Sequence, residues 1–287
     1  MNRPEIQLKK ERDFSNVFNA SFAFVTQEVG RLLRVVGLYA GVPIIIAVIM
    51  NAYYAQDTMS SVFNIMSSGN AMSEPDNLLT GLSILFSLLA QLFIAGLIPA
   101  YVAEYEAKGK DGFRADDVWE RFVTNFGAII GYSLLAAFMV IVGFGLLIFP
   151  GIYLWVPLSF VLYVKLIEEK SLGSVFSRCF QLIRNNWWKT FGIFVLAYLI
   201  MSIITGLFSL PAAIVAGIEG FMVGSGQQEA LDANSLAVIL TTVVGGLGQY
   251  LLYPVLYIIL AFQYYNLREQ KDRDSLMEKV SAINEEE

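Results

Sequence analysis

The chain has 287 residues, of which 56% are hydrophobic and 15% are charged, whereas soluble domains average about 45–50% and about 25%. This composition excludes an ordinary water-soluble globule, and the net charge of −6 does not indicate a nucleic-acid partner. The sequence has no His and one Cys, which excludes a His-containing catalytic triad, a His–Cys metal site and a disulfide framework. We therefore predict no catalytic, cofactor-binding or metal-binding residue.

Apolar stretches long enough to cross a bilayer dominate the chain, since a crossing needs about 20 apolar residues. One stretch, 128–167, is about twice that length and contains Pro150-Gly151, a pair that favours a turn. Splitting it there gives six spans. They lie at about 35–54, 78–103, 128–149, 151–167, 190–218 and 236–262.

The positive charges support this count. All 19 Lys and Arg residues precede the first span, follow the sixth, or lie at the end of or after the second and fourth spans. The connections 55–77 and 219–235 contain neither residue and carry six acids. Because Lys and Arg gather on the cytoplasmic side, we expect a multi-pass protein of a prokaryotic plasma (cytoplasmic or inner) membrane with both termini in the cytoplasm.

The predicted domains follow from these spans. Residues 1–34 form a cytoplasmic N-terminus with an interfacial helix, 35–262 form the six-span membrane domain, and 263–287 form a charged cytoplasmic tail. The first 34 residues contain no apolar signal-peptide region, so the first span is expected to act as an uncleaved anchor.

Apolar residues at helical spacing precede the first, third and fifth spans and predict amphipathic helices in the headgroup plane. The three stripes are Phe14, Val17, Phe18, Phe22, Val25, Val29 and Leu32; Val118, Trp119, Phe122, Val123 and Phe126; and Leu172, Val175, Phe176, Cys179, Phe180, Ile183 and Trp187. The predicted fold is therefore an all-α polytopic membrane protein. Its six transmembrane helices form three hairpins, each preceded by a cytoplasmic-side interfacial amphipathic helix.

The three units share short features. Each stripe contains a Val-aromatic pair (Val17-Phe18, Val118-Trp119, Val175-Phe176), and each following span carries a Tyr. Two interpretations stay open: internal duplication, or a general likeness among apolar helices at a membrane surface.

The third interfacial helix is the best candidate for lipid-headgroup contacts, because cations there have no acid between them. The candidate residues are Arg178, Arg184, Trp187, Trp188 and Lys189. The alternative is that the cations are ordinary positive-inside anchors and the tryptophans ordinary interfacial anchors.

Inside the spans, polar residues and prolines are the features that bear on packing and on a ligand. The candidate polar or kink positions are Gln91, Pro99, Pro157, Pro211, Gln249 and Pro254. Gln91, Gln249 and the pair Thr241-Thr242 could make interhelical hydrogen bonds or bind a substrate. These prolines and Pro43 should each kink a helix, a geometry compatible with a cavity.

Small residues offer faces for close helix approach. The candidates are Gly37-x-x-x-Gly41, Gly127-x-x-x-Gly131, the Ser202, Gly206 and Ser209 set, and Gly245-Gly246-Leu-Gly248.

Residues 149–191 contain Pro150-Gly151-Ile152, Pro157, Glu168-Glu169, Gly173, Arg178 and Asn186-Trp187-Trp188-Lys189-x-Phe191. This order resembles uncharacterised prokaryotic multi-pass families akin to the glycerophosphodiester phosphodiesterase membrane domain. The chemistry of that family's enzymes belongs to a separate soluble barrel, so the resemblance implies a fold and a membrane role, and it transfers no catalytic residue.

Three functions follow as hypotheses. The first is a non-enzymatic protein of membrane, envelope or lipid organisation that holds an amphipathic ligand among kinked helices, with membrane lipids as partners and no cofactor. The second is a permease for a neutral or apolar small molecule. The third is an interfacial enzyme that uses Glu104 or the pair Glu168-Glu169; solvated linkers explain these acids better. A cavity lined by the spans would favour a function in ligand binding. The sequence does not decide whether the protein forms a homo-oligomer.

Overall fold

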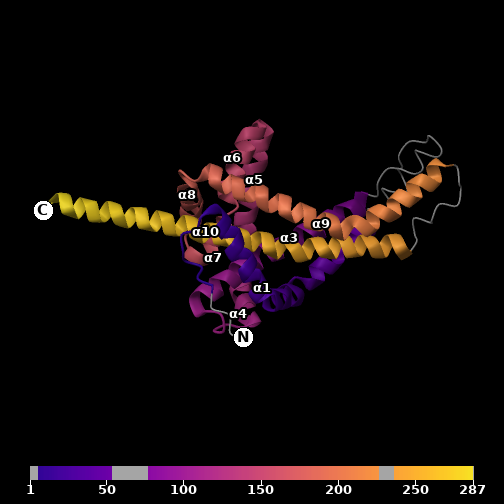
Figure 1. Ribbon diagram of the computed structural model, residues 1–287, viewed down its shortest axis with the longest axis horizontal. Helices are drawn as coiled ribbons and strands as arrows, with labels where there is room; N and C mark the ends of the chain where they lie inside the picture. Colours follow the sequence, from indigo (N-terminus) through magenta and orange to yellow (C-terminus); the bar gives the residue numbers. More distant parts are fainter. Residues whose placement is uncertain (1–5, 54–76, 226–235, 287) are drawn as a thin grey trace. The chain divides into compact units, whose positions relative to one another are not determined.

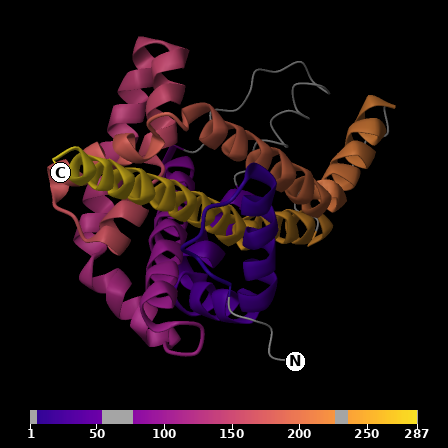
Figure 2. The same cartoon turned by 60° about the vertical axis from the view of Figure 1, so that its left-hand side comes forward.

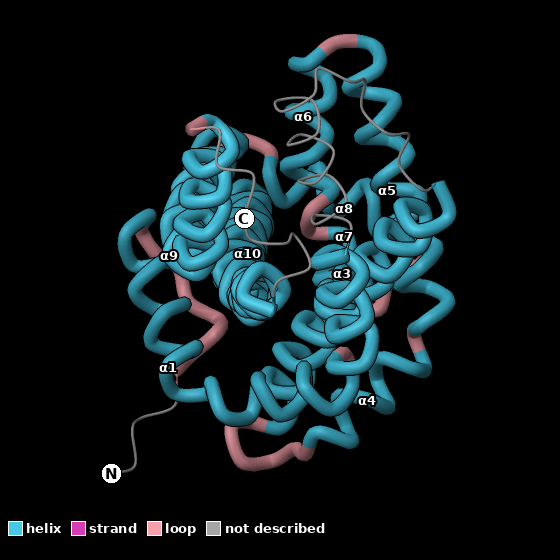
Figure 3. Tube along the Cα trace, turned by 90° about the vertical axis from the view of Figure 1, so that its right-hand side faces the viewer, coloured by secondary structure: helices cyan, strands magenta, loops and turns pink. Residues whose placement is uncertain are grey.

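The computed structural model of the chain describes residues 6–53, 77–225 and 236–286, which form helices and loops with no strand among them (Figures 1 and 3). The helices are α1 (Phe14–Tyr39), an unlabelled helix Gly41–Tyr53, α3 (Asn77–Lys108), α4 (Ala115–Thr124), α5 (Phe126–Leu146), α6 (Ile148–Leu158), α7 (Val161–Glu168), α8 (Leu172–Ile183), α9 (Trp187–Gly224) and α10 (Leu236–Glu286). The predicted connection 55–77, apart from Asn77, and most of 219–235 lie outside the described residues.

Several helices are long and apolar enough to cross a membrane. By length and composition five segments qualify: Asn77–Lys108, Phe126–Leu146, Ile148–Glu168, Trp187–Ile218 and Ile239–Arg273. The pair Phe14–Tyr39 and Gly41–Tyr53, bent by 74°, passes the same test when it is taken together. The described residues thus confirm the coarse prediction of an all-helical fold with about five to six apolar helices that could span a membrane.

The first span is bent close to Pro43, where the sequence predicts a kink. α1 continues through Val35 to Tyr39, the first residues of the predicted span 35–54, and the chain bends at Ala40. Pro43, in the first turn of the next helix, has no N–H to donate to the Tyr39 carbonyl, so the helix cannot continue unbroken.

The turn between the third and fourth predicted spans also differs in position. It lies at Leu147, ahead of the predicted Pro150-Gly151. Pro150 lies in the first turn of α6, where a missing N–H costs no intrahelical hydrogen bond. Gly151 instead permits close approach, because a Cβ on Gly143 would lie 3.0 Å from the Gly151 Cα. From this turn α5 and α6 run side by side (Figure 2).

The predicted proline kinks fall into two groups. Pro157 lies one residue before the end of α6, and the chain resumes as α7 at Val161. Pro99, Pro211 and Pro254 lie inside α3, α9 and α10, each assigned as one unbroken helix. Kinks at these three positions stay predictions.

The chain forms two compact units. Unit 1 comprises Met1–Val36, Ile94–Tyr198 and Pro254–Glu287, and unit 2 comprises Gly37–Phe93 and Leu199–Tyr253. The residue ranges of unit 2 contain no Lys or Arg, so all 19 cations belong to the ranges of unit 1. The division by contacts therefore coincides with the division by charge.

Aromatic side chains form much of the core of unit 1. Phe24 of α1 makes edge-to-face contacts with Tyr105 of α3 and Phe262 of α10, with ring centroids 4.9 and 5.6 Å apart. Tyr163 of α7 stacks on Tyr264 of α10 at 5.9 Å. The largest fully buried side chains of unit 1 also include Tyr101, Tyr265, Phe122 and Phe160. These contacts join residues far apart in sequence.

The structure has helices at the three predicted interfacial positions, and protein covers part of each apolar stripe. Val17 of α1, Val118 and Phe122 of α4, and Val175 and Cys179 of α8 are almost completely buried. These side chains pack inside unit 1 and do not face lipid. That the three helices lie in a headgroup plane stays a prediction.

The contact between Gly96 of α3 and the ring of Phe122 is tight enough to test. A Cβ on Gly96 would lie 2.6 Å from Phe122 Cε2, and the Phe122 side chain is almost completely buried. We expect Gly96→Ala to destabilise the protein by ~1–3 kcal/mol through overpacking. Gly131→Ala is the control, because no described atom lies within 4 Å of its Cβ position. Thermal unfolding in mild detergent measures both; equal melting temperatures would contradict the proposed contact.

Candidate functional site

The mid-span polar residues of the sequence analysis come together around one cavity in unit 2. The cavity has a volume of about 630 Å³, within the range of about 300–1,000 Å³ typical of small-molecule sites. It is lined by Val48, Asn51, Ala52, Ile84, Ser87, Leu88, Gln91, Ser209, Ala212, Thr241, Thr242, Gly245, Gly246, Gln249, Tyr250 and Tyr253. We call it the Gln91–Gln249 cavity.

Four helices supply the lining: Gly41–Tyr53, α3, α9 and α10. Asn51 Nδ2 donates to Ser87 Oγ at 2.8 Å and to the Ala47 carbonyl at 2.8 Å. The Ser87 hydroxyl donates to the Ser83 carbonyl at 2.7 Å. These hydrogen bonds join the helix Gly41–Tyr53 to α3 on one side of the cavity.

On α10, Gln249 keeps hydrogen-bonding capacity for a ligand. Its Nε2 donates to the Tyr253 hydroxyl at 2.9 Å, and this is its one side-chain hydrogen bond to the described part of the chain. A Gln side chain has two donors and a carbonyl oxygen with two lone pairs. Its amide oxygen can therefore accept from a bound molecule.

Glycines of α10 bring its neighbours close, as predicted for one of the small-residue faces. A Cβ on Gly248 would lie 2.5 Å from the Phe208 ring of α9, and one on Gly246 would lie 3.2 Å from Val48 Cγ1. At Gly37, Gly41, Gly127, Gly131 and Gly206 no such contact within 4 Å exists among the described residues. The prediction of close approach at those five glycines was wrong for the described part of the chain.

The lining is amphipathic and uncharged. It combines amide, hydroxyl and phenol groups with aliphatic side chains, and none of its residues is Asp, Glu, Lys or Arg. Burying an ion without a counter-ion is costly. The cavity therefore suits a neutral molecule with both polar and apolar parts.

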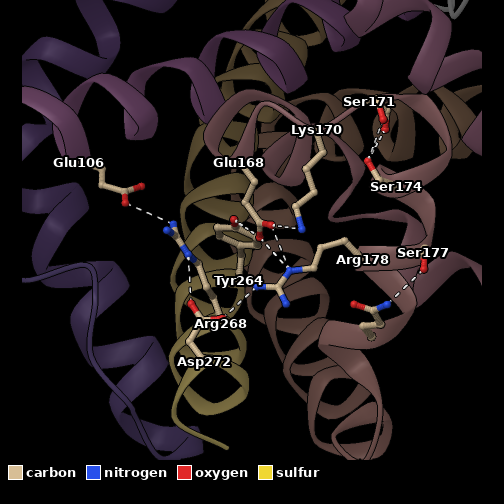
Figure 4. Close-up of polar contacts among 11 residues, drawn as sticks. Glu106, Glu168, Lys170, Ser171, Ser174, Ser177, Arg178, Tyr264, Arg268 and Asp272 are labelled. Atoms are coloured by element: carbon tan, nitrogen blue, oxygen red, sulfur yellow. Dashed lines mark hydrogen bonds and ion pairs between the residues drawn. The ribbon is translucent and has the colours of Figure 1, made fainter. Parts of the chain in front are cut away.

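Unit 1 has a different character, and Arg178, one of the predicted headgroup residues, belongs to an ion-pair network there (Figure 4). Arg178 Nε lies 3.1 Å from Glu168 Oε2, and Nη2 lies 3.2 Å from Asp272 Oδ1. Glu168 also pairs with Lys170 Nζ at 3.0 Å and accepts from the Tyr264 hydroxyl at 2.9 Å.

Arg268 extends this network along α10. Its guanidinium contacts Asp272 at 3.7 Å and Glu106 at 3.2 Å. Glu106 also accepts from the Tyr265 hydroxyl at 2.5 Å and pairs with Lys9 at 2.7 Å.

Two other buried carboxylates make similar contacts. Glu104, at the end of α3, lies 2.5 Å from Arg121 Nε of α4, and Arg121 also donates to the Leu166 carbonyl at 3.0 Å. Glu28 of α1 accepts from the Tyr101 hydroxyl at 2.7 Å. Glu104 and Glu168 were expected to be solvated linker residues. That expectation was wrong, because both carboxylates are largely buried and ion-paired.

The other predicted headgroup residues lie at or beyond the end of α8. Arg184 follows the last residue of α8 and is exposed, as is Lys189 in the first turn of α9. Trp188 is 78% exposed. Trp187 is half-buried, stacks on Tyr153 at 5.9 Å, and donates from Nε1 to the Tyr153 carbonyl at 3.3 Å.

Electrostatic surroundings differ between neighbouring residues of α8. Burial lowers the pKa of the Arg178 guanidinium, but Glu168 and Asp272 outweigh burial, and the net shift is upward. Burial raises the pKa of the Cys179 thiol to about 12, with the Glu168 charge adding to the effect.

No group of three or more His, Cys, Asp or Glu residues that could hold a metal ion occurs in the described ranges.

Cys179 should therefore be inert in the folded protein. The thiolate is the reactive form of cysteine, and its pKa of about 12 leaves little thiolate at pH 7.5. We expect maleimide labelling roughly a hundredfold slower than for the protein denatured in dodecyl sulfate. A mass-shift assay measures both rates, and comparable rates would contradict the buried position.

Comparison with known protein families identifies the family of this chain. The family model of a domain of unknown function, DUF7847, matches residues 119–267. No curated protein and no solved structure matches the chain.

Proposed function

We propose that this chain, which belongs to the DUF7847 family, is a non-enzymatic integral membrane protein that binds an uncharged amphipathic ligand in the Gln91–Gln249 cavity. The observation that carries the proposal is the convergence of two glutamines, Asn51 and the pair Thr241-Thr242 on one cavity between apolar helices. Polar groups that served only to join helices would be expected to occur singly at separate contacts.

The chemistry of the lining supports a particular ligand class. Aliphatic residues such as Val48 and Leu88 would contact an apolar chain, while Gln91 and Gln249 would bind hydroxyl, amide or ester groups. A diacylglycerol, a fatty alcohol or another neutral lipid has this combination. A role in lipid or envelope organisation fits such a ligand.

The finer topology belongs to the same proposal. We place six spans as three hairpins in a prokaryotic inner membrane, with both termini and the three short amphipathic helices on the cytoplasmic side. The confinement of Lys and Arg to residue ranges outside unit 2 supports this orientation. The association with lipid metabolism rests on the resemblance of residues 149–191 to the glycerophosphodiester phosphodiesterase membrane domain and is part of the proposal; the family match adds nothing to it.

Native mass spectrometry after extraction in mild detergent tests the ligand. We expect a neutral lipid to be retained by the wild-type protein and to fall about five- to tenfold in Gln249→Ala, because one hydrogen bond to a buried ligand is worth about 1 kcal/mol. Leu251→Ala is the control, since Leu251 is exposed on the same helix and does not line the cavity. Absence of a selectively retained lipid, or equal loss in both variants, would overturn the proposal.

A permease for a neutral small molecule is the second candidate, because helices from both the N-terminal and the C-terminal part of the sequence line one uncharged cavity. Alternating access would expose the cavity to each side of the membrane in turn. In a permease, cysteines at Gln91 and Gln249 should react with membrane-impermeant thiol reagents added from either side. Labelling from one side only is expected for a binding protein. Cys179 is buried and so gives little background.

The enzyme hypothesis has less support. Glu104 and Glu168, its proposed catalytic residues, are each held by an arginine, an arrangement typical of structural ties. We propose that neither has a catalytic role.

A further inference from the structure

A second cavity lies within unit 1, where α6 approaches the turn from α8 into α9. It has a volume of about 470 Å³, and its walls include Tyr153, Phe180, Arg184 and Trp187. We call it the Arg184 cavity. No residue lines both this cavity and the Gln91–Gln249 cavity.

The Arg184 cavity has one charged residue in its lining. No Asp or Glu lines it, and the Arg184 side chain makes no hydrogen bond or ion pair with any residue in the described ranges. Arg178, six residues earlier in α8, is by contrast paired with Glu168 and Asp272. A guanidinium has five N–H donors and keeps its charge at any physiological pH. The cavity is therefore complementary to an anion.

The other walls suit the junction between a lipid headgroup and its acyl chains. Trp187 stacks on Tyr153 with an interplanar angle of 19°, and on Phe191 at 5.2 Å. Aromatic side chains of this kind prefer the level of lipid headgroups. Ser177 and Gln181 add neutral hydrogen-bonding groups to the lining.

The turn that carries Arg184 is held in place before any ligand binds. The Arg184 amide donates to the Phe180 carbonyl at 3.1 Å, closing α8. Asn185 has a φ of 72°, a left-handed conformation that Asn tolerates better than most residues. Asn186 Nδ2 then donates to Gln270 Oε1 of α10 at 3.1 Å. Holding Arg184 on an ordered turn reduces the entropy cost of binding.

We propose that the Arg184 cavity binds the phosphate of an anionic phospholipid, with the guanidinium on the phosphate oxygens and the glycerol region against Trp187 and Tyr153. The site is independent of the neutral ligand proposed above, because it uses other residues and selects an anion instead of an uncharged molecule. Among the five predicted headgroup residues, the geometry singles out Arg184 and Trp187.

The test compares two cations close in sequence. Purified protein is equilibrated with nanodiscs or mixed micelles that contain phosphatidylglycerol and phosphatidylcholine, and bound lipid is counted by native mass spectrometry. We expect the wild-type preference for phosphatidylglycerol to fall about fivefold in Arg184→Gln, the effect of one cation on an anionic lipid. Lys189→Gln removes the same charge at an exposed residue that does not line the cavity, so its preference should stay near that of the wild type.

Several outcomes would overturn the proposal. Equal losses in Arg184→Gln and Lys189→Gln would show that general surface charge attracts the lipid. Equal binding of both lipids by the wild type would show that no anion site exists. Soluble glycerol phosphate is a further arm: if millimolar glycerol phosphate displaces the lipid, the ligand is the free phosphate ester and not the membrane lipid. Arg184→Lys should recover part of the preference, because Lys keeps the charge without the planar fork of donors.

Folding of the variants can be checked separately. Arg184 has no side-chain partner among the described residues, so Arg184→Gln should unfold at the wild-type temperature. Retention of neutral lipid by the Gln91–Gln249 cavity should also be unchanged. Failure of one cavity in these assays therefore does not imply failure of the other.

Discussion

Lys and Arg cannot be left unpaired in hydrocarbon, and this constraint organises the whole molecule. The two residue ranges of unit 2 contain none of the 19 cations, whereas those of unit 1 contain all of them. Unit 2 consequently joins its helices with neutral hydrogen bonds, such as Asn51 to Ser87, and with close glycine contacts. Unit 1 joins its helices with aromatic contacts and ion pairs. The Gln91–Gln249 cavity in unit 2 is accordingly lined by uncharged residues, whereas the Arg184 cavity in unit 1 contains a cation.

In unit 1 the ion pairs fasten short helices to the ends of long ones. Glu104 at the end of α3 binds Arg121 of α4, and Glu168 at the end of α7 binds Arg178 of α8. Removing such charges from water is costly, and a buried pair is therefore weak evidence for net stability. Its geometry is specific, however, because a carboxylate accepts from a guanidinium in few orientations. We infer that the pairs fix how α4 and α8 lie against the helices that precede them.

The sequence predicts the long helices well and their junctions less well. Apolar length indicates five to six spans, because hydrocarbon thickness sets a minimum for every crossing. The turn at Leu147 was predicted three residues too late, at Pro150-Gly151, since a proline in the first turn of a helix costs little and marks the start of that helix, not the break before it. The bend at Ala40, by contrast, lies close to the kink predicted at Pro43. Which acidic residues are buried in ion pairs and which are exposed could not be predicted from the sequence. Glu104 and Glu169 look alike in sequence, yet Glu104 is buried against Arg121, and the side chain of Glu169 is 77% exposed.

The polar residues inside the spans show why the sequence pattern alone does not identify a binding site. Gln91 and Gln249 each satisfy the description of an interhelical hydrogen-bonding residue, and nothing in one sequence says that they line the same space. Only packing of four helices places them together. A similar ambiguity affects the cations of α8 and the residues that follow it. Arg178 and Arg184 belong to one basic segment, but Arg178 is occupied by carboxylates from α7 and α10, and Arg184, beyond the last residue of α8, faces a cavity without acids. A cation is available to a ligand only where the fold has left it without an internal counter-ion, so the unpaired arginine, and not the most basic stretch, indicates where an anion binds.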